Sequence, residues 1–259
     1  MTIKKELEDY LRNWHAGIGK LIAAKQIWVP ERFDVASLAD GKTQYTVQEP
    51  ICLGSLPLGS GMSRKQPKLW AFIDGSFESI HDGDDERLSS FGASIVFFEA
   101  KPRHRRFRLL DAFHFDYHCS TVPSSPHPLF HTQRNIRWEV ERWKQVFERG
   151  QFGEFAEYRF PDFNHGVKAV LFKLTRFRVP TARIDLFAAI LATLADMVVQ
   201  HDVAEHCGVF NDLVDLTASD KNPLHRLLRP QVNVPKCFEH GHSSAHTWYP
   251  RYSAQATGR

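Results

Sequence analysis

The chain has 259 residues, of which 42% are hydrophobic and 24% charged, and its formal net charge is +3. This balance is typical of a globular protein with a sizeable core and excludes a disordered chain. No run of 18 consecutive apolar residues occurs and the first ten residues lack an apolar signal segment, so we expect no membrane association. The four cysteines are widely spaced, which favours a reducing, cytoplasmic location without disulfides.

The first half of the chain predicts one helix followed by strands. Apolar residues recur at three- and four-residue steps from Leu7 to Ile22, which predicts an amphipathic helix within residues 1–25. Residues 26–68 are interrupted by glycine and proline, and we expect them to be irregular. Three strands are predicted, over residues 69–80, 93–99 and 107–118, and a polar turn over 81–87 joins the first two. The short connections require antiparallel pairing.

The second half predicts mainly helices. After a proline-rich loop we expect a helix over 132–149, a strand over 167–179, a buried helix over 181–200 with Thr181 as its N-cap, and a helix that includes 209–216. Residues 230–259 are polar and are expected to be an irregular tail. The order of elements predicts a single α+β domain over 1–259, with an antiparallel sheet of about four to six strands packed against several helices.

The strongest chemical pattern is the sequence from His114 to His118. Alternate side chains of a strand share a face, so His114, Asp116 and His118 would lie together. We predict a divalent-metal site, for Zn, Mn or Mg, with His114, Asp116, His118 and His127 as ligands. A catalytic role would use His114, Asp116, His118 and His131. Asp74, Ser76 and Glu78 share a face of an earlier strand and would add carboxylates if that strand is a neighbour. The chain has 14 histidines, so the cluster is also explained by chance.

Basic residues form two groups. Lys101, Arg103, Arg105, Arg106 and Arg108 lie within eight residues, and Arg176 and Arg178 belong to a second group. Clustered cations of this kind predict a phosphate-binding, nucleic-acid-binding face, and the alternative is a set of solvated strand ends. A third cluster, of Cys237, His240, His242 and His246, has zinc-ligand chemistry but matches no common finger spacing.

One combination of segments is similar to a known group of proteins. Phe115-Asp116-Tyr117-His118 is followed by a proline-rich loop to His127-Pro128-Leu129-Phe130-His131-Thr132-Gln133, and later by Pro180-Thr181-Ala182-Arg183-Ile184-Asp185-Leu186. Over residues 70–200 this resembles small uncharacterised bacterial proteins encoded near toxin–antitoxin or phage-defence genes. The resemblance implies a role in nucleic-acid-directed defence and transfers no catalytic residue.

These observations leave three hypotheses. The first is a defence-associated subunit that binds nucleic acid or a protein partner, including a second copy of itself, through a basic and aromatic surface. The second is a metal-dependent phosphodiesterase or nuclease that uses the His-x-Asp-x-His strand. The third is a structural interaction protein in which the histidines are incidental.

Overall fold

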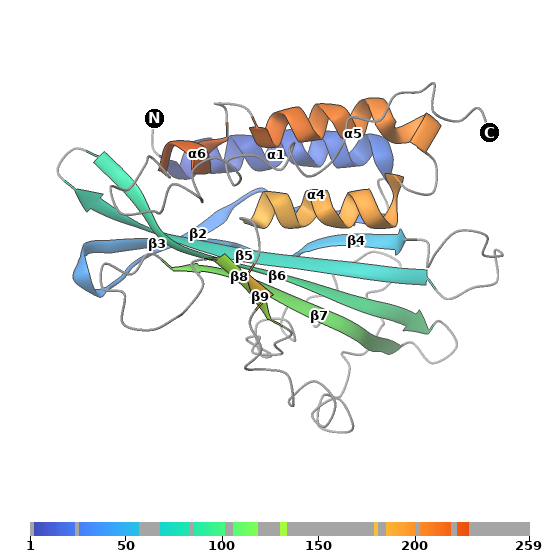
Figure 1. The fold of residues 1–259 in the computed structure, drawn as a ribbon, viewed down its shortest axis with the longest axis horizontal. Helices are drawn as coiled ribbons and strands as arrows, with labels where there is room; N and C mark the ends of the chain where they lie inside the picture. The colour runs from blue at the N-terminus through green and yellow to red at the C-terminus, as the bar shows by residue number, and fades with distance from the viewer. Residues whose placement is uncertain are drawn as a thin grey trace.

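The computed structural model describes residues 3–23, 26–56, 68–82, 85–101, 106–118, 130–133, 179–180, 185–199, 203–218 and 222–227. Within these ranges the chain forms one antiparallel sheet with α-helices layered over one of its faces (Figure 1). The predicted α+β class is therefore confirmed. The predicted helix over 132–149, most of the strand over 167–179 and the tail over 230–259 lie outside the described residues.

The sheet is built around three long strands. β5 pairs with β6 and β6 pairs with β7, always antiparallel, and the full path through the sheet is β1-β4-β5-β6-β7-β8-β9. β3 also pairs with β5, beside β4, and carries β2 at its outer side. The strand bounds are Ile27–Trp28 for β1, Phe33–Ser37 for β2, Lys42–Val47 for β3, Ile51–Leu56 for β4, Lys68–Asp82 for β5, Asp85–Lys101 for β6, Arg106–His118 for β7, Phe130–Gln133 for β8 and Val179–Pro180 for β9.

The prediction that residues 26–68 are irregular is wrong for the part that the structure describes. Residues 27–56 contain β1 to β4, and β3 and β4 both pair with β5. Tyr45 lies opposite Phe77 and Ile51 lies opposite Ile73. Pairing with a distant strand supplies hydrogen bonds and apolar partners that local turn signals do not reveal. Thr132 and Gln133, expected at the start of a helix, are likewise in a strand.

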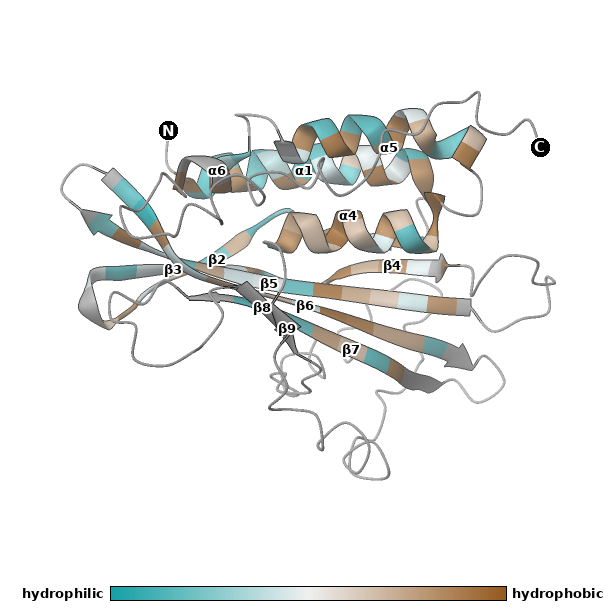
Figure 2. Cartoon of the chain, in the orientation of Figure 1, coloured by the Kyte–Doolittle hydropathy of each residue, from teal (hydrophilic) through white to brown (hydrophobic). Residues whose placement is uncertain are grey.

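The helices form two layers above the sheet. α4 (Leu186–Met197) lies directly on β5 and β6, and α1 (Ile3–Leu21) and α5 (Val203–Ala218) lie above it (Figure 1). The short α6 (Pro223–Leu227) contacts α1 and β6. The ring of Phe187 in α4 lies 4.5 Å from that of Tyr10 and 5.8 Å from that of Trp14. Because α4 is covered on two sides it is apolar nearly all round, as the sequence predicted, whereas α1 and α5 have polar outer faces (Figure 2).

The start of α4 corrects one prediction. The N-cap is Asp185 and not Thr181: the Asp185 carboxylate accepts hydrogen bonds from the backbone N–H groups of Phe187 and Ala188, both at 3.0 Å. These donors have no partner within the helix, so the carboxylate satisfies them where the helix meets the sheet.

The second face of the sheet is also apolar near β4. Trp70, Phe72 and Phe98 are all buried there, and the rings of Phe72 and Phe98 meet edge to face. The indole of Trp70 lies against the backbone of β4, where a Cβ on Gly54 would come within 2.2 Å of it. Glycine at this position is therefore required for the close approach of the ring. None of the described helices is long and apolar enough to cross a membrane.

Candidate functional site

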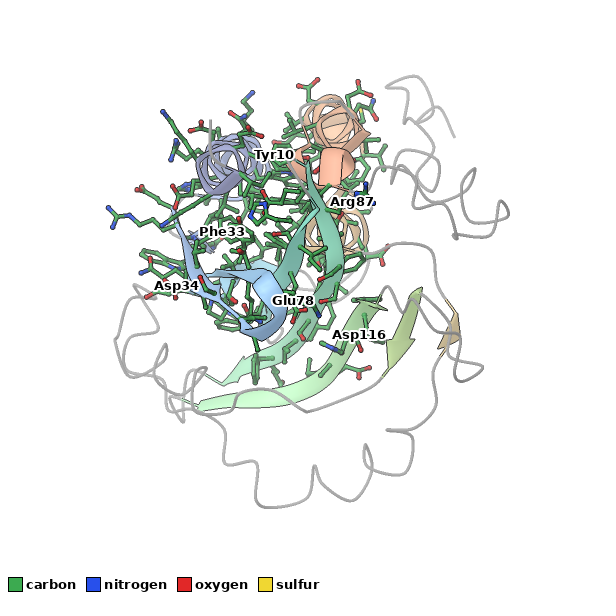
Figure 3. The ribbon with its side chains drawn as sticks, turned by 90° about the vertical axis from the view of Figure 1, so that its left-hand side faces the viewer. Tyr10, Phe33, Asp34, Glu78, Arg87 and Asp116 are labelled. Carbon is green, nitrogen blue, oxygen red and sulfur yellow. The ribbon has the colours of Figure 1, made fainter. Side chains whose placement is uncertain are left out.

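The register of β5, β6 and β7 brings polar residues together on the face of the sheet that points away from α4. Asp74, Ser94 and His114 lie opposite one another across the three strands. The next row on this face contains Ser76, Gly92 and Asp116. Gly75, between Asp74 and Ser76, faces Leu186 of α4 on the other side. Figure 3 shows Asp116 on β7, well away from the layer of α1 and α5.

Three of these side chains are joined by one hydrogen bond and one ion-pair contact. The Ser94 Oγ lies 2.8 Å from Nδ1 of His114, and Nε2 of His114 lies 2.5 Å from Oδ1 of Asp116. The side chains of His114 and Asp116 are 27% and 30% exposed, so a molecule in solution can reach them. The predicted common face of His114 and Asp116 is confirmed.

The direction of these hydrogen bonds follows from the groups involved. An ionised carboxylate only accepts hydrogen bonds, so the tautomer that suits the contact with Asp116 is the one with its hydrogen on Nε2 of His114. A neutral imidazole has one N–H, which leaves Nδ1 with a lone pair facing the Ser94 hydroxyl. Ser94 then donates its proton toward Nδ1. The arrangement joins a hydroxyl, a base and a carboxylate that orients the base.

The predicted carboxylates on β5 also lie on this face. The Asp74 carboxylate accepts a hydrogen bond from the Gly75 amide at 2.9 Å. Glu78 lies four positions further along β5, where its Oε2 is 3.4 Å from Nζ of Lys42. β5 is not a direct neighbour of the histidine strand, because β6 lies between them, so the condition set by the sequence is not met; the carboxylates of β5 share only the face of the sheet with His114 and Asp116.

The geometry of these side chains does not support the predicted divalent-metal site. Both ring nitrogens of His114 are engaged by neighbouring side chains. Among the residues that the structure describes, no group of three or more His, Cys, Asp or Glu side chains is placed to hold an ion. For the other predicted residues, the register puts His118 opposite Ser90 and His131 opposite Asp116. His127 and the cluster around Cys237 lie outside the described residues, so those parts of the metal hypothesis stay predictions.

The basic residues of the first group flank one end of the β6–β7 hairpin. Lys101, the last residue of β6, lies opposite Arg106, the first of β7, and Arg108 lies opposite Glu99. Arg103 and Arg105 belong to the connection, and together with Arg176 and Arg178 they are outside the described residues. The other end of β6 is acidic, because Asp82 of β5 lies opposite Asp85 there and Glu86 follows.

The sequence hypotheses missed one residue of the site, Ser94. Its signal was a single hydroxyl in the apolar run from Ala93 to Phe98, where a polar side chain needs a partner. That partner, His114, is 20 residues away and becomes visible only through the register.

Comparisons with known proteins give no relative on which to base a function. No protein-family model matches the chain, and neither a curated protein nor a solved structure matches it. The resemblance to defence-linked bacterial proteins therefore stays a prediction.

Proposed function

We propose that this protein binds nucleic acid through the basic end of its β6–β7 hairpin. The observation that carries the proposal is the register that closes this hairpin with Lys101 opposite Arg106. It puts Lys101, Arg106 and Arg108 at one end of one structural element, and Arg103 and Arg105 lie between Lys101 and Arg106 in the sequence. Phosphates of a nucleic-acid backbone are the abundant anions that such a group attracts.

The distribution of charge along β6 supports an oriented complex. β6 has 17 residues, so its two ends are roughly 50 Å apart at the usual rise of a strand. Asp82, Asp85 and Glu86 lie at one end, and the basic group lies at the other. The two ends lie far beyond the screening length of about 8 Å at physiological salt, so each acts on a ligand independently. A polyanion is attracted to the basic end and repelled from the acidic one.

This function is the first of the three hypotheses from the sequence, a subunit that binds nucleic acid or a protein partner. The binding surface is now assigned to one end of the β6–β7 hairpin. A role as a subunit of a bacterial defence complex, with a protein partner or a second copy of the chain, remains part of that hypothesis. The support for it is the resemblance over residues 70–200 alone.

The direct test is binding of a fluorescently labelled 20-nucleotide strand, single or double, followed by anisotropy as salt is raised. Five phosphate contacts release enough counterions to weaken binding between 50 and 200 mM salt roughly 500-fold for a duplex and roughly 100-fold for a single strand. We expect a steep, linear fall of the logarithm of affinity with the logarithm of salt concentration. Absent binding at 50 mM salt, or an affinity that salt leaves unchanged, would contradict the proposal.

A further inference from the structure

The contacts that join Ser94, His114 and Asp116 lie away from the hairpin end to which we assign the binding of nucleic acid. Ser94 is in the interior of β6, seven residues before Lys101, and faces away from the helices. Contacts between polar side chains on neighbouring strands can serve stability alone. Stability alone does not require a serine hydroxyl within hydrogen-bond distance of an imidazole nitrogen. The three groups are in the order that activates a hydroxyl: nucleophile, base, and a carboxylate that fixes the base.

We propose that Ser94 is a catalytic nucleophile of a metal-independent hydrolase centre, with His114 as its general base and Asp116 as the positioning residue. The 2.8 Å distance from the Ser94 Oγ to the His114 Nδ1 is within reach for proton transfer. The 2.5 Å contact from Nε2 to the Asp116 Oδ1 holds the ring in the tautomer that leaves Nδ1 free to accept. His114 and Asp116 both come from β7, the neighbour of the strand that carries Ser94, so regular sheet geometry preorganises the centre.

The reaction is acyl transfer to water in two steps. The Ser94 Oγ forms a bond to the acyl carbon of an ester, its proton passes to Nδ1 of His114, and the bond from that carbon to the leaving oxygen breaks. His114 returns the proton to the leaving alkoxide, which departs as an alcohol. In the second step a water molecule gives a proton to His114 and its oxygen attacks the acyl carbon. The bond from that carbon to the Ser94 Oγ breaks, Oγ takes the proton back from His114, and the carboxylic acid leaves.

The charges around Ser94 select a neutral ester over a phosphodiester. Asp74 lies directly opposite Ser94 in β5, and Asp116 is joined to it through His114. Paired positions on adjacent strands are about 5 Å apart, so an anionic phosphodiester at Ser94 would meet two carboxylates at short range. A neutral carboxylic ester avoids this repulsion. A Cβ at position 92 would lie 3.4 Å from Cε1 of His114 and 3.6 Å from Oδ1 of Asp116. Glycine at this position therefore leaves His114 and Asp116 uncovered on that side.

The test uses the full chain with two probes, a fluorophosphonate that labels activated serines and p-nitrophenyl acetate as a neutral ester. Peptide mass spectrometry should find the label on Ser94. His114→Asn removes the base and should slow labelling by about 10²–10⁴-fold, and Ser94→Ala should abolish both labelling at this site and ester hydrolysis. Ser90→Ala is the matched control, because Ser90 is on the same face of β6, opposite Glu78, and contributes nothing to the chain of hydrogen bonds. It should retain the rates of the parent protein.

Asp116→Asn tests whether Asp116 orients the ring of His114 or only packs against it. Asn keeps the shape but presents either a neutral oxygen or an N–H to Nε2, so the tautomer is no longer fixed. We expect slower labelling with an unchanged melting temperature. Circular dichroism confirms that each variant is folded before its rate is compared.

Three outcomes would overturn the proposal: folded protein without label on Ser94, equal labelling rates in the parent and in His114→Asn, or ester hydrolysis that EDTA abolishes and Zn or Mn restores. The last of these would support the metal-dependent alternative. None of them bears on nucleic-acid binding, which uses a different part of the chain and a different assay.

Discussion

A Cβ on Gly75 of β5 would lie 3.0 Å from both Cβ and Cδ1 of Leu186, the first residue of α4, and 3.3 Å from the carbonyl oxygen of Gly92. The helix therefore rests on the sheet at a point where only hydrogen fits. We predict that Gly75→Ala lowers the free energy of unfolding by about 1–3 kcal/mol, since neither Cβ of Leu186, which is fixed to the helix backbone, nor the carbonyl of Gly92 in β6 can move aside cheaply. Urea denaturation measures the change.

The matched control is Gly208→Ala in α5, where a Cβ meets nothing within 4 Å. Alanine favours a helix over glycine, so this variant should be more stable by about 0.5–1 kcal/mol. Equal effects of the two substitutions would contradict the close approach of α4 to the sheet.

The N-cap of α4 gives a second prediction. Asp185→Ala leaves the amides of Phe187 and Ala188 without their acceptor and should cost about 0.5–2 kcal/mol of stability. Asp185→Asn keeps an acceptor oxygen and should retain most of that stability. Melting temperatures of the two variants decide the matter, and a loss as large in the Asn variant as in the Ala variant would rule out the capping role.

A third prediction concerns Tyr45, whose hydroxyl donates to Oε1 of Glu86 at 2.9 Å. Burial, and then the hydrogen bond to Glu86 and its charge, raise the pKa of Tyr45 well above its usual value. The folded protein therefore holds this proton more tightly than the unfolded chain, so the stabilisation is complete below the unfolded pKa of about 10 and declines as pH rises further.

Tyr45→Phe should accordingly be less stable than the parent by about 1–3 kcal/mol at neutral pH, with the difference shrinking between about pH 10 and 12. Urea denaturation of both proteins across this range provides the measurement. A difference that stays constant with pH would show that the proton on Tyr45 is not linked to folding.

A fourth prediction concerns Cys52 in β4, which is buried and whose pKa is raised by that burial. The thiolate is the reactive form, so the native protein should resist alkylation at Cys52 by iodoacetamide at pH 8. Peptide mass spectrometry should detect modification at this residue only after unfolding in urea. Rapid modification in the native protein would contradict the burial of this face near β4.

The sequence predicted those elements whose pattern is local and strong. The three- and four-residue recurrence of apolar residues from Leu7 to Ile22 predicted α1, and alternation of polar and apolar residues predicted β7 with His114 and Asp116 on one face. β3 and β4 were missed because they pair with β5, which is 30 or more residues further along for β3, and β2 was missed because its partner is β3. Pairing with a distant strand leaves no pattern in the sequence of the segment itself.

The sequence predicted two residues of the candidate site and missed the third, because only the first two are close in the chain. His114 and Asp116 are two residues apart, and the period of a strand is enough to bring them together. Ser94 joins them only because β6 and β7 pair in one particular register, and a shift of one residue would have put it on the other face. Thr181 and Asp185 are both good capping residues, and only the structure shows which one precedes the first helical turn.

The central claim is that nucleic acid binds at the basic end of the β6–β7 hairpin, and one pair of variants tests it most directly. Lys101→Glu/Arg106→Glu reverses two charges at that end, while Lys5→Glu/Lys20→Glu makes the same change in net charge on exposed positions of α1. Anisotropy titrations with a labelled oligonucleotide over a range of salt give affinity and salt slope for both. We predict that only the hairpin variant loses affinity sharply, with a salt slope reduced by about 2. Equal weakening by the two variants would show that net charge alone governs binding and would contradict the account.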